Sequence, residues 1–178
     1  SRNYCPDGQC DRGAGRGLTP SSQEMLELAR ATTGNVCTDK LLKAMRQKAG
    51  EYDKKGPFGG ACARAVRTGL ENAGIHKRGG GLGDAKDMGP GLEKLGFQNI
   101  RSSKINSPEQ APVGAILVYG KALRPGCKGQ GSTFGHVEVK DFNTFLYDGT
   151  AHRDIQKIFG AACRPLIGVY VPRKEMKC

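Results

Sequence analysis

The chain has 178 residues, a length that suits one domain with a hydrophobic core of its own. Its formal net charge is +11, which favours an anionic partner such as nucleic acid, a lipid surface or an anionic cell-wall polymer. Binding of single-stranded nucleic acid is disfavoured, because the chain has no Trp and only 6% of its residues are aromatic. No apolar run is long enough to cross a bilayer, so we expect no transmembrane segment.

Residues 1–18 are rich in Gly, Arg and Asp and lack periodicity, so we expect an irregular N-terminal arm. Residues 19–178 are expected to form a single domain, with a helical half at about 19–100 and a sheet half at about 111–172. A capping box at residues 21–24 predicts a short amphipathic helix, and Thr38 is placed to cap a second helix over residues 39–49. Asp84 is placed to cap a third, short helix.

Residues 59–74 predict a turn followed by a helix, with Cys62 in its first turn. Small and apolar residues recur at a spacing of three and four along positions 62, 65, 66, 69, 70 and 73, and Gly74 is placed to end the helix. The dipole of a helix favours the nucleophilic thiolate form of a cysteine at its N-terminus. The alternative is that Cys62 is a buried small hydrophobe or half of a disulfide.

Seven cysteines occur, without a CxxC pair or the Cys/His spacing of a zinc site. This usage suggests an oxidising compartment, where an odd number leaves at least one thiol unpaired. We expect that thiol to be Cys62, because the others lie in Gly-, Pro- or charge-rich segments or near the termini. The six disulfide candidates are Cys5, Cys10, Cys37, Cys127, Cys163 and Cys178. Sequence proximity favours Cys5–Cys10, and the other pairings we consider are Cys127–Cys163 and Cys37–Cys178.

Strands are expected in the second half of the chain, at residues 113–119, 135–140, 145–149 and 166–171. The segment 135–140 alternates strictly, so that its two valines face one way while His136, Glu138 and Lys140 face the other. Helices first and strands afterwards indicate an α+β fold, in which the helices pack against an antiparallel sheet.

A thiolate nucleophile needs a base, and the base needs a third group that fixes its tautomer. Of the three histidines, His76 follows the wrong end of the Cys62 helix and His152 lies in a polar segment. His136 begins a regular strand and is the candidate base, although a lone strand histidine is often only structural or exposed. Asp148 lies on the neighbouring predicted strand and is the candidate orienting residue; the alternative is a turn aspartate.

Residues 60–74 together with residues 135–139 resemble the NlpC and CHAP superfamily of papain-like cell-wall hydrolases. There the cysteine begins a helix packed on an antiparallel sheet, the histidine begins the second strand, and a polar residue on the next strand orients the histidine. The resemblance covers about residues 55–172. Two departures leave the subfamily open: Ala61 and Ala63 flank the cysteine, and the strand before the histidine has no Gly-Asp entry.

The resemblance implies a papain-like fold of the NlpC/CHAP type and a secreted or periplasmic cysteine hydrolase that cleaves amide bonds in peptidoglycan. The enzyme would be an endopeptidase or an N-acetylmuramoyl-L-alanine amidase, with Cys62 as nucleophile, His136 as general acid and base, and Asp148 as orienting residue. We expect no metal and no organic cofactor. The expected partners are the peptidoglycan or muropeptide substrate and anionic wall polymers, and no nucleic acid.

Two other classes of function remain open at this point. One is a non-catalytic basic protein that binds the cell wall on the same fold. The other is a thiol redox protein, which would need a resolving cysteine close in sequence to Cys62, and the chain has none there.

Overall fold

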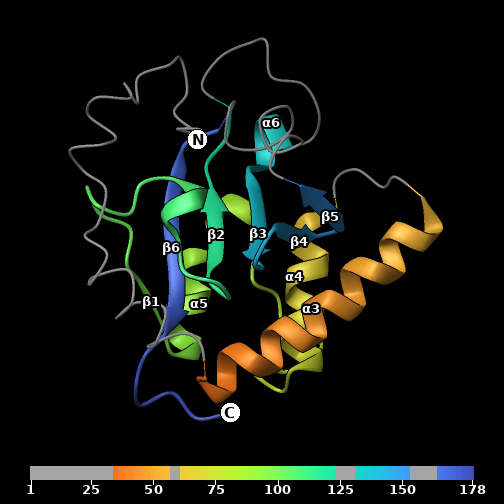
Figure 1. The fold of residues 1–178 in the computed structure, drawn as a ribbon, viewed down its shortest axis with the longest axis horizontal. Helices are drawn as coiled ribbons and strands as arrows, with labels where there is room; N and C mark the ends of the chain where they lie inside the picture. Colours follow the sequence, from red (N-terminus) through yellow and green to blue (C-terminus); the bar gives the residue numbers. More distant parts are fainter. Residues whose placement is uncertain (1–33, 57–60, 123–130, 153–163) are drawn as a thin grey trace.

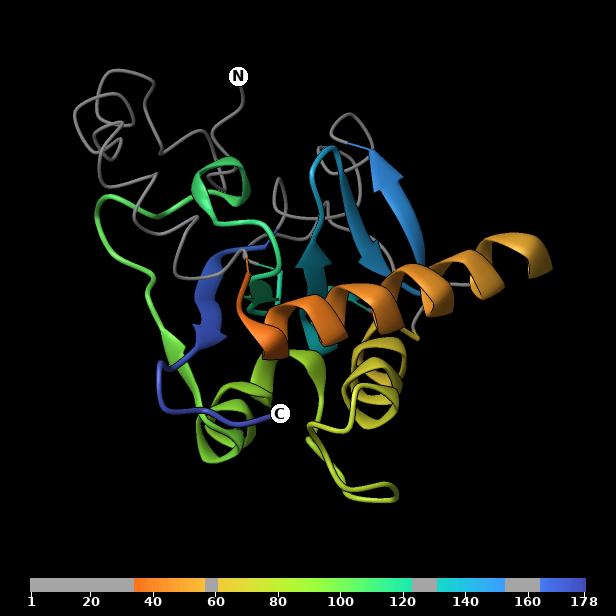
Figure 2. The same ribbon diagram turned by 60° about the horizontal axis from the view of Figure 1, so that its bottom comes forward.

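The computed structural model describes residues 34–56, 61–122, 131–152 and 164–178, which form an antiparallel sheet with helices on one face (Figures 1 and 2). The sheet has six strands in the order β1-β6-β2-β3-β4-β5. The strands are β1 Phe97–Asn99, β2 Ile116–Tyr119, β3 His136–Lys140, β4 Thr144–Tyr147, β5 Gly149–His152 and β6 Leu166–Pro172. The expected α+β fold with an antiparallel sheet is therefore confirmed.

Two strands were not expected from the sequence. β1 pairs with β6 at one edge of the sheet, and β5 pairs with β4 at the other, which places His152 in a strand rather than in a polar loop. Strands of three and four residues are too short to show a period, so only their neighbours in the sheet reveal them.

The helices of the described chain are unequal in length. They are α3 Val36–Lys55, α4 Cys62–Asn72, α5 Gly89–Leu95 and α6 Gly131–Phe134, with 3₁₀ turns η2 Ala85–Asp87 and η3 Pro108–Gln110. Figure 2 shows α3, α4 and α5 together on one side of the strands. Their apolar side chains form one buried cluster with the sheet, which includes Met45, Val66, Leu92, Val137 and Val139.

The opposite face of the sheet is also covered. A second buried cluster joins Leu117, Tyr119 and Phe145 to Ile105 and Ala111, which lie in the long connection between β1 and β2. In Figure 2 this connection (green) passes on the side of the strands away from the helices. The alternating face of β3 that the sequence assigned to polar residues is therefore inside the protein, which explains how Glu138 comes to be completely buried.

α3 begins earlier and ends later than expected. Its N-cap is Asn35 rather than Thr38, since the Asn35 side-chain oxygen accepts from the backbone N–H groups of Cys37 at 2.8 Å and Thr38 at 3.2 Å. The helix also continues through Gly50 to Lys55. A glycine inside a helix costs about 1 kcal/mol, which the burial of the apolar side of α3 easily offsets.

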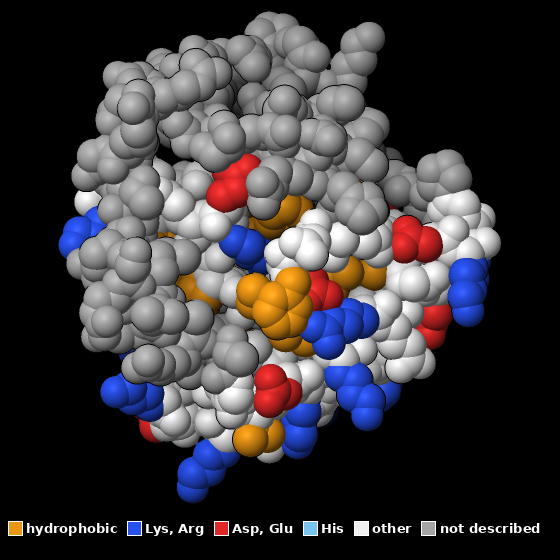
Figure 3. Space-filling model, viewed as in Figure 1, with side chains coloured by type: hydrophobic (Ala, Val, Ile, Leu, Met, Phe, Trp, Pro, Cys, Tyr) orange, Lys and Arg blue, Asp and Glu red, His pale blue; other side chains and the backbone are white. Residues whose placement is uncertain are grey.

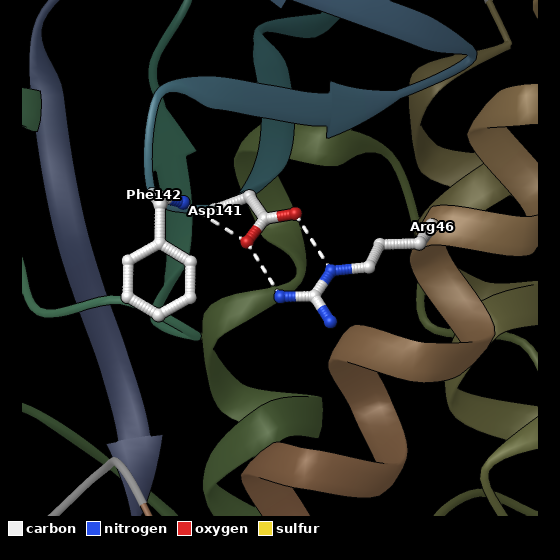
Figure 4. Close-up of polar contacts among 3 residues, drawn as sticks. All are labelled: Arg46, Asp141 and Phe142. Carbon is white, nitrogen blue, oxygen red and sulfur yellow. Dashed lines mark hydrogen bonds and ion pairs between the residues drawn. The ribbon is translucent and has the colours of Figure 1, made fainter.

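An ion pair joins α3 to the turn between β3 and β4 (Figure 4). Arg46 donates from Nε and Nη2 to the two carboxylate oxygens of Asp141, both at 2.8 Å, and Asp141 also accepts from the backbone N–H of Phe142. The Arg46 side chain is 49% exposed, so we expect the pair to contribute less than about 1 kcal/mol. Its effect is mainly to orient the turn.

A disulfide between Cys37 and Cys178 ties the C-terminal tail to the start of α3, which confirms that expected pairing. Lys40 donates to the backbone oxygen of Cys178 at 3.0 Å and adds to the same connection. The other disulfide candidates lie outside the described residues, as do the expected N-terminal arm and first helix; these cysteines are Cys5, Cys10, Cys127 and Cys163. In the described part of the chain, no helix is long and apolar enough to cross a membrane.

Candidate functional site

Cys62 is the first residue of α4, as the sequence predicts, and it carries a free, half-buried thiol. The small-residue side of α4 packs on α3 and the sheet, with Ala65, Val66, Gly69 and Leu70 buried. A Cβ at Gly69 would lie 2.2 Å from the sulfur of a methionine on α3, so glycine there permits the close approach of the two helices. The helix position is therefore set by packing, and Cys62 is held at its N-terminus.

His136 is the first residue of β3 and is buried. Gly135 precedes it with a φ of 76°, and a Cβ at this glycine would lie 2.3 Å from the backbone oxygen of Tyr119. Only glycine fits this close approach in a left-handed conformation. Tyr119 on β2 is also the residue that pairs with His136 across the sheet. The neighbouring strand therefore fixes the position of the His136 backbone.

The side chains of Cys62 and His136 meet between the helix and the strand. Burial by itself raises the pKa of the thiol, but the hydrogen bond to His136 and the charge of the imidazole outweigh it, so the pKa of Cys62 is lowered. Burial lowers the pKa of His136, but the bonds and charges of Cys62 and Glu138 raise it to about 10. The two shifts together favour a thiolate beside an imidazolium, which is the reactive state of a cysteine nucleophile.

Glu138 is the partner of the imidazole on its other side. Its Oε1 lies 2.8 Å from Nε2 of His136, and its Oε2 accepts from the hydroxyl of Tyr119 at 2.8 Å. The carboxylate is 0% exposed. This arrangement leaves Nδ1 of His136 for the thiol and stabilises the protonated ring, as the third group of a nucleophile–base–carboxylate triad does.

Sequence reasoning did not single out Glu138 as a site residue. The signal was present, because residues two apart in a strand lie on the same face and Glu138 follows His136 at that spacing. What the sequence did not reveal was that this face is covered, so that the carboxylate is confined beside the ring.

Asp148 is also at the site, 6% exposed, but its hydrogen bond goes elsewhere. Its Oδ2 accepts from the backbone N–H of Ala61 at 3.1 Å, immediately before Cys62. Burial raises the pKa of Asp148, while the Ala61 bond and the charge of His136 act in the opposite direction. The ring contact expected of Asp148 is made by Glu138, so an orienting role for Asp148 remains a prediction, and its observed bond holds the entry to α4.

Two tyrosine rings enclose the imidazole. The Tyr147 ring meets His136 edge-on with centroids 5.0 Å apart, and the Tyr119 ring is tilted against it at 5.7 Å. Burial, followed by the charges of Glu138 and Asp148, raises the pKa of Tyr147, so its hydroxyl stays neutral in the pH range where enzymes work. These two ring contacts limit the orientations that the His136 imidazole can adopt.

Comparison with known proteins gives little. No protein-family model matches the sequence, and no curated protein matches it. Among solved structures, the type VI native effector-immunity complex Tae3-Tai3 from Ralstonia pickettii contains a similar chain, 25% identical, with a TM-score of 0.38. The match covers 58% of this chain and 76% of that chain. Such a TM-score does not establish a common fold, so the chemistry of the site follows from its own residues.

His76 takes no part in the described site. His76 lies beyond the C-terminal end of α4, and its Nε2 is 2.8 Å from the backbone oxygen of Gly80. His152 is in β5 at the edge of the sheet. Within the described residues, no group of three or more His, Cys, Asp or Glu side chains is arranged to hold a metal ion.

The arrangement provides the parts needed for acyl transfer. The pKa of the Cys62 thiol is lowered by His136, and the other side of the imidazole meets the buried carboxylate of Glu138. The first backbone N–H groups of a helix have no acceptor within it, so the N–H of Cys62 at the start of α4 is free of the helical bonding pattern. A backbone N–H at this position of a helix can donate to an oxyanion that forms beside a reacting sulfur.

Proposed function

We propose that this protein is a cysteine hydrolase that cleaves amide bonds in peptidoglycan. The observation that carries the proposal is the thiol at the helix N-terminus, whose pKa is lowered by His136. Structural cysteines in an apolar environment have raised pKa values instead. A buried histidine in contact with a completely buried carboxylate supports the same interpretation. Removing two charged groups from water has a large desolvation cost, so a buried pair of this kind contributes little to stability.

The mechanism follows from the positions of the side chains. The thiolate of Cys62 attacks the carbonyl carbon of the amide, and the backbone N–H of Cys62 stabilises the oxyanion. His136 then gives its proton to the leaving amine, which departs and leaves a thioester on Cys62. A water molecule loses a proton to His136 and attacks the thioester, releasing the acid and the thiolate. Glu138 keeps the ring oriented throughout, and Asp148 holds Ala61 and with it the start of α4.

Two further features support peptidoglycan as the substrate. The cysteine and histidine segments resemble those of the NlpC and CHAP hydrolases, and the net charge of +11 would hold the protein near anionic wall polymers. The bond cut would be a peptide bond within the stem or cross-link, or the N-acetylmuramoyl-L-alanine bond. A secreted or periplasmic location fits the Cys37–Cys178 disulfide, which forms in oxidising compartments.

The proposal is tested by replacing the nucleophile. Cys62→Ala should abolish release of soluble muropeptides from purified sacculi and leave the fold intact, since alanine is small and a good helix former. Thermal unfolding of the variant provides the control for folding. Turnover by a folded Cys62→Ala protein would contradict the whole assignment.

The alternative is a non-catalytic basic protein that binds the cell wall, which the charge alone would also support. The same experiment separates the two. A wall-binding protein would sediment with sacculi and release nothing, and alkylation of Cys62 with iodoacetamide would leave its binding unchanged. An enzyme would lose its turnover on alkylation.

A further inference from the structure

Arg164 lies at the same end of the sheet as the reactive thiol. It comes just before β6, where Leu166 pairs with Tyr119, and Tyr119 pairs in turn with His136 on the other side. The backbone oxygen of Pro165 accepts from Gly120 at 2.9 Å, which holds this entry to β6 against the end of β2. Arg164 thus lies just before β6, the strand adjacent to the one that carries Tyr119.

The side chain of Arg164 is buried, and one of its guanidinium nitrogens has no hydrogen-bond partner among the described residues. Arg164 is 6% exposed, and its Nε is shielded from solvent and has no hydrogen-bond partner. Burial lowers the pKa of Arg164, while the charges of Cys62, Glu138 and the two tyrosines act to raise it. Those groups are the components of the proposed active site, so the cation lies close to the reacting atoms.

Neither buried carboxylate of the site makes an ion pair with this cation in the described structure. Glu138 has its two oxygens engaged by His136 and Tyr119, and Asp148 accepts from Ala61. A buried nitrogen of a charged group that lacks a hydrogen-bond partner is costly, and a bound ligand can supply that partner. An anion that enters the site with the substrate would satisfy the guanidinium.

We propose that Arg164 binds a carboxylate of the substrate beside the thiol of Cys62, and so selects amide bonds next to a residue with a free carboxylate. This inference rests on the proposed function, because it specifies the substrate of the same site. The guanidinium presents parallel N–H groups that match the two oxygens of a carboxylate. Peptide stems of a cell wall carry free carboxylates at their ends and side branches, and an enzyme with this residue would distinguish them from amidated stems.

A pair of alkylating reagents tests the carboxylate site without any turnover. Iodoacetate and iodoacetamide both lose iodide to the thiolate and differ only in that the first carries a carboxylate. The ratio of their rates at Cys62, measured by mass spectrometry of the peptide that contains it, cancels any change in the thiol's pKa. Arg164→Gln should lower the iodoacetate-to-iodoacetamide ratio roughly tenfold, the effect of losing one hydrogen-bonded charge.

A matched control removes the same charge from the surface. Arg173→Gln, at an exposed position just after β6, should leave the ratio unchanged. Arg164→Lys keeps the charge without the parallel N–H groups, so its ratio should fall between those of the parent and Arg164→Gln. An equal ratio in the parent and in folded Arg164→Gln would overturn the proposal, as would an equal fall in Arg173→Gln.

A measurement on the unmodified protein decides the matter if Arg164→Gln does not fold. N-acetyl-D-alanine should protect Cys62 from iodoacetamide, and N-acetyl-D-alaninamide, which lacks the carboxylate, should protect at least several-fold less well. Equal protection by the two would overturn the carboxylate site. If this difference is found but sacculi are not cleaved, the carboxylate site stands and the proposed function fails.

The same distinction should appear in turnover. Amidating the carboxylate next to the cleaved bond of a soluble muropeptide should lower kcat/KM of the parent roughly tenfold. The amidated and free substrates should be cleaved at equal rates by Arg164→Gln. Hydrolysis that does not respond to amidation in the parent would support the hydrolase and contradict the role of Arg164.

Discussion

Glu138 and His136 lie two residues apart on β3, so their side chains project from the same face of the strand. Oε1 of the carboxylate lies 2.8 Å from Nε2 of the imidazole. The histidine and its carboxylate partner are therefore positioned by one short stretch of backbone. The thiol comes from a different element, the start of α4, which packs on the face of the sheet that carries Val137 and Val139. The position of the thiol relative to the imidazole thus depends on how firmly α4 is held against the sheet.

The first prediction separates the two carboxylates of the site. Glu138→Gln should lower kcat at least roughly tenfold, because an amide does not stabilise the imidazolium as a carboxylate does. Asp148→Asn should have a smaller effect, since the amide oxygen can still accept from the N–H of Ala61. The two variants are compared by kcat on a soluble muropeptide. If Asp148→Asn lowered kcat as much as Glu138→Gln, the result would support Asp148 as the residue that orients His136.

The second prediction concerns pH. The pKa of Cys62 is lowered from its usual value by His136, so alkylation by iodoacetamide should reach half its maximal rate below pH 9.0. In His136→Ala burial still raises the pKa of Cys62, but the imidazole that lowers it is gone. The pH at which alkylation is half-maximal should therefore be higher than in the parent. Hydrolysis by the parent should decline again near pH 10, where the imidazolium loses the proton that the leaving amine needs. A midpoint that is unchanged in His136→Ala would show that the two side chains are not coupled.

The third prediction concerns the disulfide between α3 and the C-terminal tail. Cys178→Ser opens a loop whose ends are 141 residues apart in sequence, and its loss should lower the free energy of unfolding by about 2–5 kcal/mol. Urea unfolding of the parent and the variant measures this difference. The bond joins the first turn of α3 to the C-terminus and includes none of the proposed catalytic residues, so kcat at a temperature where both proteins are folded should not change. A large loss of kcat in folded protein would mean that the tail supports the site directly.

The fourth prediction concerns the glycine before the histidine. In Gly135→Ala the new Cβ would collide with the backbone of Tyr119, which cannot move without disturbing the centre of the sheet. We expect a loss of stability of more than about 2 kcal/mol together with slower alkylation of Cys62, because the ring is displaced. Gly79→Ala is the control: its φ is 81° and its Cβ would meet nothing within 4 Å, so only the backbone strain of about 1–2 kcal/mol should appear. Equal effects of the two substitutions would contradict the role of the close approach.

The fifth prediction concerns charge. In the view of Figure 3, Lys and Arg side chains follow the surface that α3 occupies. The exposed cations of that helix are Lys40, Lys43, Arg46, Lys54 and Lys55. If they hold the protein on anionic wall polymers, activity on sacculi should fall as salt rises, since exposed charges are screened over about 10 Å at 0.1 M. Activity on a small soluble muropeptide should hardly change. Equal salt sensitivity for the two substrates would exclude attraction to the polymer as the cause.

Local features of the sequence were sufficient to predict that Cys62 lies at the start of a helix and His136 at the start of a strand. The spacing of small residues after Cys62 and the φ of 75° at Gly74 are properties of one helix and its end, and the alternation around His136 is a property of one strand. Each depends on residues close in the chain, so periodicity revealed both. The Cys37–Cys178 pairing was one of several considered from the sequence, and the structure shows it joining the C-terminal tail to the start of α3.

Only the tertiary structure decided which polar groups serve these two residues. Whether Glu138 is solvated or confined beside the ring depends on the connection between β1 and β2 that covers its face of the sheet. The bond from Ala61 to Asp148 joins residues 87 apart, and no local pattern encodes it. The same holds for the buried Nε of Arg164, which has no hydrogen-bond partner among the described residues. The burial of a charged side chain depends on all the elements packed around it, whereas the period of a helix or strand depends on its own residues alone.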